Sequence, residues 1–282
     1  MSWQSFRVVF RLRSPLHSGW GKVGNLQRTR AYITGRTLWG ALTMRLTRDA
    51  AQGCDTGIDS CEYRRMGEQV HKNLAFTYFF PALKSGDEFP VIWPWEDEPA
   101  FRSRFISSYQ ATALSYPQQS ASEGMLHEVE FIVPYTLDTG EPVYLVGYVF
   151  ERKGGRLDWQ SAFKRLQLGG ERGYGWGDVR LFGIGESRDG ELFNGAAIFN
   201  GVAAVPMIRV SAGQRLLAHA LARGLPANGD VEPLVGREWR ADNPGKRFVG
   251  QHVAFNGVCF LPGSVVKEDL DFAVNEFGLW KY

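Results

Sequence analysis

Hydrophobic and polar residues alternate strictly near the start of the chain. In SFRVVFRLR, residues 5–13, one face carries four apolar side chains, and three arginines lie on the other. The apolar residues are Phe6, Val8, Phe10 and Leu12. This period of two predicts a half-buried β-strand with a basic outer face.

Three later segments have the spacing of amphipathic helices. In TLWGALTMRLTRD, residues 37–49, leucines recur every four positions at 38, 42 and 46. LDWQSAFKRLQLGG, residues 157–170, has Asp158 near its start, an apolar face that includes Trp159, and Gly169 just past its expected end. We expect a third helix around SAGQRLLAHALARG, residues 211–224.

Other segments indicate strands. They are LAFTYFF (74–80), the pair HEVEFIVPY (127–135) and EPVYLVGYVF (141–150) joined by a turn, DVRLFGI (178–184) and HVAFNGVCFL (252–261). The order strand, helix, strands, helix, strand predicts an α+β fold with a ferredoxin-like core. We therefore divide the chain into a ferredoxin-like domain, residues 1–186 with insertions at about 51–127, and a β-rich accessory region, residues 187–282.

A glycine-rich segment, LQLGGERGYGWGDVRL, occupies residues 166–181. Its five glycines are Gly169, Gly170, Gly173, Gly175 and Gly177, and Arg172, Tyr174 and Trp176 are interleaved with them. So many glycines would cost a helix or strand too much backbone order. The segment is therefore a predicted loop whose backbone is closely approached.

Composition restricts the class of protein. The chain has 282 residues, of which 44% are hydrophobic and 22% charged, as in a globular protein. No apolar run approaches the roughly 18 residues of a membrane span, and the first residues lack a signal-peptide core, so we expect a cytoplasmic protein without a membrane partner. Three cysteines are too few for a disulfide framework.

Charge is unevenly distributed although the net charge is only +2. Residues 1–50 contain nine Lys or Arg and one acid, whereas residues 51–101 contain four Lys or Arg and nine acids. A basic N-terminal segment favours a polyanionic partner, with nucleic acid as the first candidate. A solvated basic face is the alternative.

The loop predicted between the first strand and the first helix, residues 14–36, contains Gly19-x-Gly21-x-x-Gly24. This matches a dinucleotide-binding fingerprint, but no helix opens at the first glycine, so the context argues against that site. The loop instead offers a phosphate-binding surface before a helix N-terminus, made of His17, Lys22, Arg28, Arg30, Tyr32 and Arg36. Taken singly, each arginine also suits a surface ion pair, and His17 a structural role.

These segments resemble the RAMP superfamily, the RNA-binding proteins of CRISPR antiviral defence, which have ferredoxin-like, RRM-related folds. SPLHSGWG and YITGRTLWGAL are similar to the superfamily's first motif, although Thr34 and Arg36 replace its usual proline and serine. LGGERGYGWGDV is similar to its glycine-rich loop, and residues 111–132 resemble the thumb hairpin of type III backbone subunits. The resemblance covers roughly residues 5–182.

The resemblance implies a subunit of a type III effector complex that binds guide RNA, target RNA and other effector subunits, with no cofactor. RNA contacts are expected from His17, Lys22, Arg28, Arg30, Arg36 and the glycine-rich loop residues 169, 170 and 172–177. Target-cleaving members carry an aspartate in the first loop, whereas residues 14–36 contain no Asp or Glu. The chain therefore resembles a non-cleaving member.

Two alternatives stay open. One is a metal-independent guide-processing endoribonuclease in which His17, Tyr32 and Lys22 supply acid, base and cation. The other is a scaffold that docks neighbouring subunits through the aromatic segments 74–83 and 91–101. The mid-chain position of the glycine-rich loop and the thumb-like segment favour RNA binding over cleavage.

A metal site is a weaker hypothesis. Cys54, Cys61 and His71 offer three ligands, with His252 or Cys259 as a fourth, but their spacing is not that of a standard zinc finger. Buried free thiols are the favoured interpretation.

Overall fold

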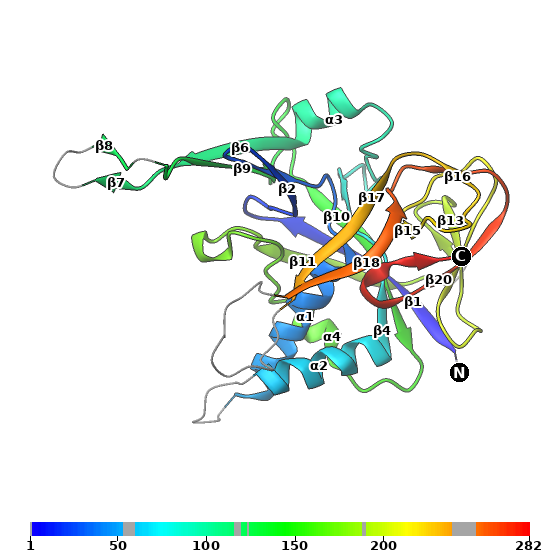
Figure 1. The fold of residues 1–282 in the computed structure, drawn as a ribbon. Helices are drawn as coiled ribbons and strands as arrows, with labels where there is room; N and C mark the ends of the chain where they lie inside the picture. Colours follow the sequence, from blue (N-terminus) through cyan, green and yellow to red (C-terminus); the bar gives the residue numbers. More distant parts are fainter. Residues whose placement is uncertain (1, 53–59, 116–119, 123, 188–189, 239–251) are drawn as a thin grey trace.

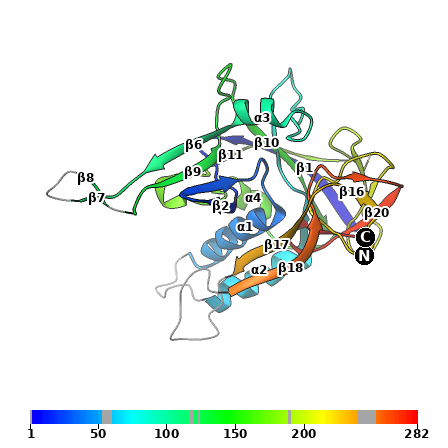
Figure 2. The same ribbon diagram turned by 45° about the horizontal axis from the view of Figure 1, so that its top comes forward.

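The structure is a computed structural model that describes residues 2–52, 60–115, 120–122, 124–187, 190–238 and 252–282. The fold is mixed α+β and consists mostly of strands (Figure 1). Both termini lie at one end of the molecule, and a long hairpin projects from the opposite end (Figures 1 and 2). No helix in the described ranges is long and apolar enough to cross a membrane.

The first sheet contains five strands: β1 (Trp3–Leu12), β4 (Leu74–Phe76), β5 (Phe80–Ala82), β10 (Tyr144–Arg152) and β11 (Val179–Glu186). The strands run antiparallel in the order β11-β1-β10-β4, and β5 also pairs with β10. β4 and β5 fall inside the range 51–127 that we treated as insertions, yet they belong to this sheet. The predicted strand 74–80 is divided because the Thr77 hydroxyl accepts the N–H of Tyr148 at 2.8 Å and interrupts the ladder.

Helices cover one face of this sheet. They are α1 (Gly35–Ala50), α2 (Ser60–Asn73) and α4 (Trp159–Phe163). The predicted leucine face of α1 is confirmed, since Leu38, Leu42 and Leu46 are buried. Thr34 caps α1 by accepting the N–H of Thr37 at 3.3 Å. Sequence reasoning missed α2, which has few apolar positions.

Two helix predictions are wrong in extent or in kind. The helix expected at 157–170 ends at Phe163, because Leu166 and Leu168 are buried from a non-helical segment that leads into the glycine-rich loop. No helix forms at 211–224: residues 216–220 are all buried, whereas a surface helix would bury only one stripe. That segment is irregular, with turns and a bend, and contributes β15 (Ala220–Leu221).

A second sheet lies at the base of the projecting hairpin. Its strands are β2 (Gly19–Val23), β3 (Leu26–Thr29), β9 (His127–Ile132) and β6 (Ile106–Ala111), in that order. The expectation of an uninterrupted loop over residues 14–36 is therefore wrong. All five residues of β2 are exposed, so the strand leaves no periodic hydrophobic signal in the sequence.

The hairpin expected at 111–132 is present but begins earlier. β6 pairs antiparallel with β9, and β7 (Leu114–Ser115) pairs with β8 (Ser120–Ala121) toward the tip (Figure 1). The expected pairing of 127–135 with 141–150 is limited to one antiparallel bridge between Tyr135 and Pro142, because β9 pairs with β6 while β10 pairs with β1. Pro134 lacks the N–H that would extend the ladder beyond β9.

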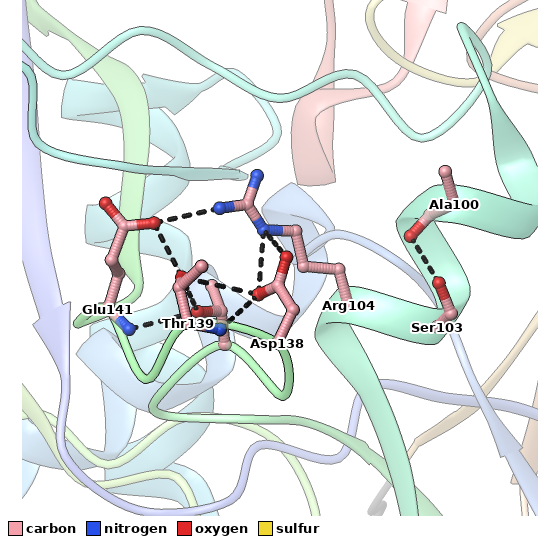
Figure 3. Close-up of polar contacts among 7 residues, drawn as sticks. Ala100, Ser103, Arg104, Asp138, Thr139 and Glu141 are labelled. Carbon is pink, nitrogen blue, oxygen red and sulfur yellow. Dashed lines mark hydrogen bonds and ion pairs between the residues drawn. The ribbon is translucent and has the colours of Figure 1, made fainter.

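Helix α3 (Glu98–Phe105) fixes the base of the hairpin. Arg104 forms ion pairs with Asp138 at 2.9 Å and Glu141 at 2.8 Å, both in the turn after β9 (Figure 3). Thr139 donates to the same Glu141 carboxylate at 2.8 Å. This cluster holds the turn against α3.

The rest of the chain forms an eight-stranded sheet in the order β12-β13-β14-β20-β21-β15-β18-β17 and a small β16-β19 pair. The remaining bounds are β12 (Glu191–Leu192), β13 (Ala197–Asn200), β14 (Met207–Val210), β16 (Ala227–Asn228), β17 (Val231–Glu238), β18 (His252–Phe260), β19 (Val265–Val266), β20 (Leu270–Val274), β21 (Trp280–Lys281) and the 3-10 turn η2 (Glu276–Gly278). The predicted strand 252–261 is confirmed as β18. One buried cluster joins this region to the first sheet, containing both Tyr148 and Trp280.

Candidate nucleic-acid interface

A cleft of about 1280 Å³ opens between the β2–β3 hairpin, the N-terminus of α1 and the β17–β18 hairpin. Both views place the β17–β18 hairpin beside α1 (Figures 1 and 2). Four of the predicted RNA-contacting residues line it: His17, Lys22, Arg30 and Arg36. The other wall consists of residues 232–236, Asn256, Asn275, Phe277 and their neighbours, which sequence reasoning did not single out.

Lys22 and Arg36 face the cleft from different elements. Lys22 is exposed on β2, and Arg36 lies in the first turn of α1 with its guanidinium 4.6 Å from the centre of the Phe277 ring. A Cβ on Gly236 would come within 2.6 Å of Arg36 Cζ, so the glycine lets this guanidinium lie against β17. With the positive end of the α1 dipole, these cations make a surface suited to phosphate groups.

Arg30 is instead part of a buried polar network below the cleft. Its Nη2 lies 2.6 Å from Glu232 Oε1, and His219 Nε2 contacts the same oxygen at 2.7 Å. The Tyr78 hydroxyl lies 2.7 Å from His219 Nδ1. Because a carboxylate only accepts hydrogen bonds, Nε2 donates to Glu232. Burial lowers the pKa of His219 and so favours the neutral ring, in which Nδ1 accepts from the Tyr78 hydroxyl.

Burial and partners shift the pKa values in this network. Burial lowers the pKa of His219, although the hydrogen bond to Glu232 opposes the shift. Burial acts to raise the pKa of Glu232, but the bond from His219 and the charge of Arg30 hold it below its ordinary value. The network therefore contains a carboxylate, a neutral imidazole and a guanidinium, and it connects β3 to β17.

Arg28 is committed to another ion-pair cluster. Glu130, whose side chain is only 9% exposed, contacts Arg28 at 2.9 Å and Arg102 at 2.7 Å. The N–H of Thr29 donates to the same carboxylate at 3.1 Å. Arg28 thus fastens β3 to β9 and does not line the cleft.

His17 joins three segments that are distant in sequence. Its Nδ1 lies 2.7 Å from the carbonyl oxygen of Glu130 on β9, and its own carbonyl accepts the N–H of Gly170 at 2.9 Å. The first loop, the glycine-rich loop and the projecting hairpin therefore meet at this residue, which is 6% exposed.

Tyr32 is enclosed rather than presented to the cleft. Its ring stacks on Tyr78 with centres 5.6 Å apart, and its hydroxyl accepts from Arg30 at 3.3 Å. Burial raises the pKa of Tyr32 to about 12, against the opposing charge of Arg30. Of the three residues considered for acid–base work, only His17 and Lys22 line the cleft.

The glycines of the glycine-rich loop fall into two groups. A Cβ on Gly169 would lie 2.3 Å from the His17 carbonyl oxygen, and one on Gly177 would lie 1.8 Å from that of Leu168. Both also have φ near +80°. Gly170 is similarly close to the His17 ring, at 3.0 Å. These glycines permit contacts within the chain itself.

The tip of the same loop is open. The 3-10 turn η1 (Arg172–Tyr174) carries Tyr174, which is 77% exposed, and a Cβ on Gly173 or Gly175 would meet no atom within 4 Å. Arg172 contacts the Met44 sulfur of α1 at 3.2 Å. Trp176 packs against Phe131 of β9 with ring centres 5.0 Å apart.

The metal hypothesis finds little support in the described residues. Cys54 lies outside them, and no group of three metal-ligating side chains occurs within them. His71 stacks on Trp39 with ring centres 4.8 Å apart. Cys259 is a buried thiol as expected, and burial raises its pKa to about 11, but Cys61 is exposed, so the expectation of burial is wrong there.

The two aromatic segments considered for subunit docking differ in exposure. Residues 74–83 are buried throughout, so they form core rather than surface, and the docking hypothesis is wrong for them. In 91–101, Trp93 and Trp95 stack with ring centres 5.0 Å apart and pack partly buried against the core, while residues 96–100 are exposed.

Comparisons with known proteins give a limited result. No protein-family model and no curated protein matches the chain. A chain of "Cryo-EM structure of the Type III-B Cmr-beta bound to cognate target RNA and AMPPnP, state 1" is similar over 93% of this chain and 86% of its own, with 12% identity and a TM-score of 0.47. A chain of "Cryo-EM structure of the Type III-B Cmr-beta bound to cognate target RNA" matches over 66% and 61%, with 13% identity and a TM-score of 0.40. At these values the likeness carries no argument about function.

Proposed function

We propose that the protein is a non-catalytic RNA-binding subunit of a type III CRISPR ribonucleoprotein effector complex. The observation that carries the proposal is the meeting of the first loop, the glycine-rich loop and the projecting hairpin at His17, beside a cleft lined by Lys22 and Arg36. These are the three segments on which the resemblance to the RAMP superfamily rests. The proposal places the subunit in the cytoplasm, with guide RNA, target RNA and other effector subunits as partners.

The topology of the first sheet supports a ferredoxin-like core for residues 1–186. Its elements follow the order β1, α1, β4, β10, α4, β11, which is a β-α-β-β-α-β sequence. The first and third of these strands, β1 and β10, are adjacent at the centre of the sheet order β11-β1-β10-β4. Residues 187–282 then form the accessory region that supplies the second wall of the cleft.

Electrostatics support a nucleic-acid ligand in the cleft. Lys22, Arg36 and the positive end of the α1 dipole face a space large enough for several nucleotides. Two acids also line it: Glu232, which is paired with Arg30, and Glu276, which is exposed. Phosphates attract cations regardless of base sequence, so this surface supplies affinity and position rather than readout.

The state of the acid–base candidates favours binding over cleavage. The His17 ring is held by the Glu130 carbonyl, and the Tyr32 hydroxyl is enclosed with its pKa raised to about 12. A general acid or base acts best with a pKa near the working pH and with access to the ribose. Because His17 and Lys22 do line one cleft, the endoribonuclease remains the second candidate.

The test measures RNA binding across a salt series by fluorescence anisotropy, with labelled single-stranded CRISPR repeat RNA. For the double variant Lys22→Gln/Arg36→Gln, we expect the slope of log K against log salt to decrease by about 1.4, roughly 0.7 for each lost phosphate contact. The matched control is Arg209→Gln, since Arg209 is a half-exposed arginine on β14 outside the cleft lining. An unchanged slope in the double variant would contradict the proposal.

Cleavage is tested on denaturing gels in EDTA with the same RNA. We expect intact RNA with the unaltered protein. His17→Asn keeps a donor near the Glu130 carbonyl but removes the imidazole ring. Site-specific cleavage by the unaltered protein that disappears in this variant, while the variant still folds, would contradict a binding-only function and support the endoribonuclease.

A further inference from the structure

Trp20 is exposed in a position where a tryptophan is unusual. It lies on β2, lines the cleft and is 52% exposed, although tryptophan is normally mostly buried. The guanidinium of Arg30 lies 5.8 Å from the ring centre, which fixes one charged neighbour of the indole. Arg30 is itself held by Glu232, so the indole has a rigid support at the edge of the cleft.

The facing wall of the cleft is apolar where it follows β17. Pro233, Leu234 and Val235 line it in succession, and the Phe277 ring continues it beneath the Arg36 guanidinium. An aromatic platform on one side and an apolar wall on the other suit a flat ring between them. Neither wall alone would exclude water from both faces of such a ring.

Three carboxamides are among the polar groups that line the same cleft. Asn256 of β18, Asn275 before η2 and Gln27 of β3 all line it. Within the residues that the structure describes, none of these three side-chain amides has a hydrogen-bond partner. A carboxamide offers a donor and an acceptor side by side, which matches the edge of a nucleobase better than it matches a phosphate.

We propose that the cleft holds an unpaired nucleotide, whose base stacks on Trp20 and whose edge meets the amides of Asn256 and Asn275. The inference rests on the proposed RNA-binding function and deepens it by naming the ligand as single-stranded RNA with an accessible base. Lys22 and Arg36 would neutralise the flanking phosphates. A duplex could not use this site, because its bases are stacked on each other and their edges are paired.

Because different residues are proposed to contact the base and the phosphates, their substitution should have separable effects. Removing the indole costs the stacking of one base and leaves the phosphate contacts, so affinity falls while the salt slope stays constant. Removing the amides should reduce discrimination among bases, since phosphate contacts carry no sequence information and cannot replace this readout. Asn256 and Asn275, which are proposed to meet the base edge, both belong to the accessory region, which thereby becomes part of the RNA site.

The experiment compares the full-length protein with Trp20→Ala, Trp20→Phe and Val23→Ala. Val23 is 65% exposed on the same strand and does not line the cleft, so it is the matched control. The probes are short labelled oligoadenylate, oligouridylate and oligocytidylate, and a duplex RNA of equal length. We expect Trp20→Ala to bind single strands about tenfold more weakly, Trp20→Phe to recover most of the loss, and Val23→Ala to change nothing.

Two further readouts complete the test. The salt slope should be the same for Trp20→Ala as for the unaltered protein, and Asn256→Ala/Asn275→Ala should reduce the differences in affinity among the three oligonucleotides. Equal binding of duplex and single strand, or no loss in Trp20→Ala, would overturn this inference while leaving a salt-dependent RNA binder intact. The proposed function would instead be overturned if the protein bound no RNA, or if the slope of log K against log salt were unchanged in Lys22→Gln/Arg36→Gln.

Discussion

Two arginines of the basic N-terminal segment and the exposed Lys22 have different surroundings although they are neighbours in sequence. Arg28 and Arg30 form ion pairs with Glu130 and Glu232, which lie 102 and 202 residues away along the chain. Lys22 and Arg36 face the cleft. The basic segment therefore contains arginines that distant acids hold in place, and we propose that Lys22 and Arg36 bind RNA.

The glycine-rich loop shows the same division between a locked part and an open part. Gly169 and Gly177 lie where any Cβ would collide with backbone of this chain, whereas Gly173 and Gly175 border open space. The loop is thus folded against the first loop at its base and free to contact a ligand at its tip. Variants that separate the two parts test this comparison.

The largest expected effect is on stability at the base of the loop. Gly177→Ala would place a Cβ 1.8 Å from the Leu168 oxygen at a φ of +80°, so we expect a loss of more than about 3 kcal/mol in the free energy of unfolding. Gly173→Ala is the control at the tip and should change stability by less than about 0.5 kcal/mol. Urea unfolding followed by circular dichroism measures both, and equal effects would erase the distinction.

The next effect concerns Arg28 and Arg102, which form ion pairs with the same carboxylate. Glu130→Gln removes the carboxylate shared by Arg28 and Arg102, and we expect a loss of about 2 kcal/mol, because the acid is nearly buried while the arginines are partly solvated. Asp271→Asn breaks an ion pair whose partners are each 53% exposed and should cost less than about 0.5 kcal/mol. A Glu130→Gln variant as stable as Asp271→Asn would show that this cluster holds nothing together.

A smaller effect is expected from pH through the network below the cleft. Because burial lowers the pKa of His219 below its ordinary 6.5, the unfolded chain binds its proton more readily than the folded chain does. Stability should therefore be greatest above pH 6.5 and fall as the pH decreases below that value. The lowered pKa of Glu232 gives a further loss below its ordinary 4.5.

Thermal unfolding between pH 7.5 and pH 5 measures this dependence. In His219→Phe the titrating ring is gone, so the melting temperature should be lower throughout but should change less over this interval. His127→Gln, at the base of the projecting hairpin, serves as the control histidine. A pH dependence that survives unchanged in His219→Phe would contradict the assignment.

The smallest effect on stability is expected at Lys22, which is exposed on β2. Lys22→Gln should leave the free energy of unfolding within about 0.5 kcal/mol of the unaltered protein while lowering the RNA salt slope by about 0.7. Arg28→Gln should do the reverse, weakening the fold by about 1 kcal/mol and leaving the slope intact. Paired unfolding and anisotropy measurements distinguish the two, and a lower slope in Arg28→Gln would place that arginine on RNA.

Local patterns predicted the parts of the fold whose burial follows one period. The alternation in β1 and the leucine spacing in α1 led to the right elements, because Val8, Phe10 and Leu12 of β1 and the leucines of α1 are buried in one cluster. The expectation of a half-buried β1 is wrong, since Trp3, Ser5 and Val9 are buried on its other face. The strand β2 was not predicted, because none of its residues is buried and no hydrophobic period marks it. The helix predicted at 211–224 was wrong, because residues 216–220 are all buried and such a run has no period that distinguishes a helix from non-helical structure.

The candidate site was predictable only on one side. His17, Lys22 and Arg36 could be found because they lie in one basic, glycine-containing stretch that precedes a helix. Glu232, Asn256 and Phe277 could not, since they reach the cleft through tertiary packing of the last third of the chain. For the same reason the sequence did not reveal that Arg28 and Arg30 are already paired.

The most direct test of the central claim maps where RNA lies on the protein. A single-stranded CRISPR repeat RNA with 4-thiouridine at successive positions would be photo-crosslinked to the full-length protein, and the linked peptides identified by mass spectrometry. The account predicts crosslinks from β2, the first turn of α1, the tip of the glycine-rich loop and the β17–β18 hairpin. Crosslinks confined to other surfaces, such as β13 and β14, would contradict it.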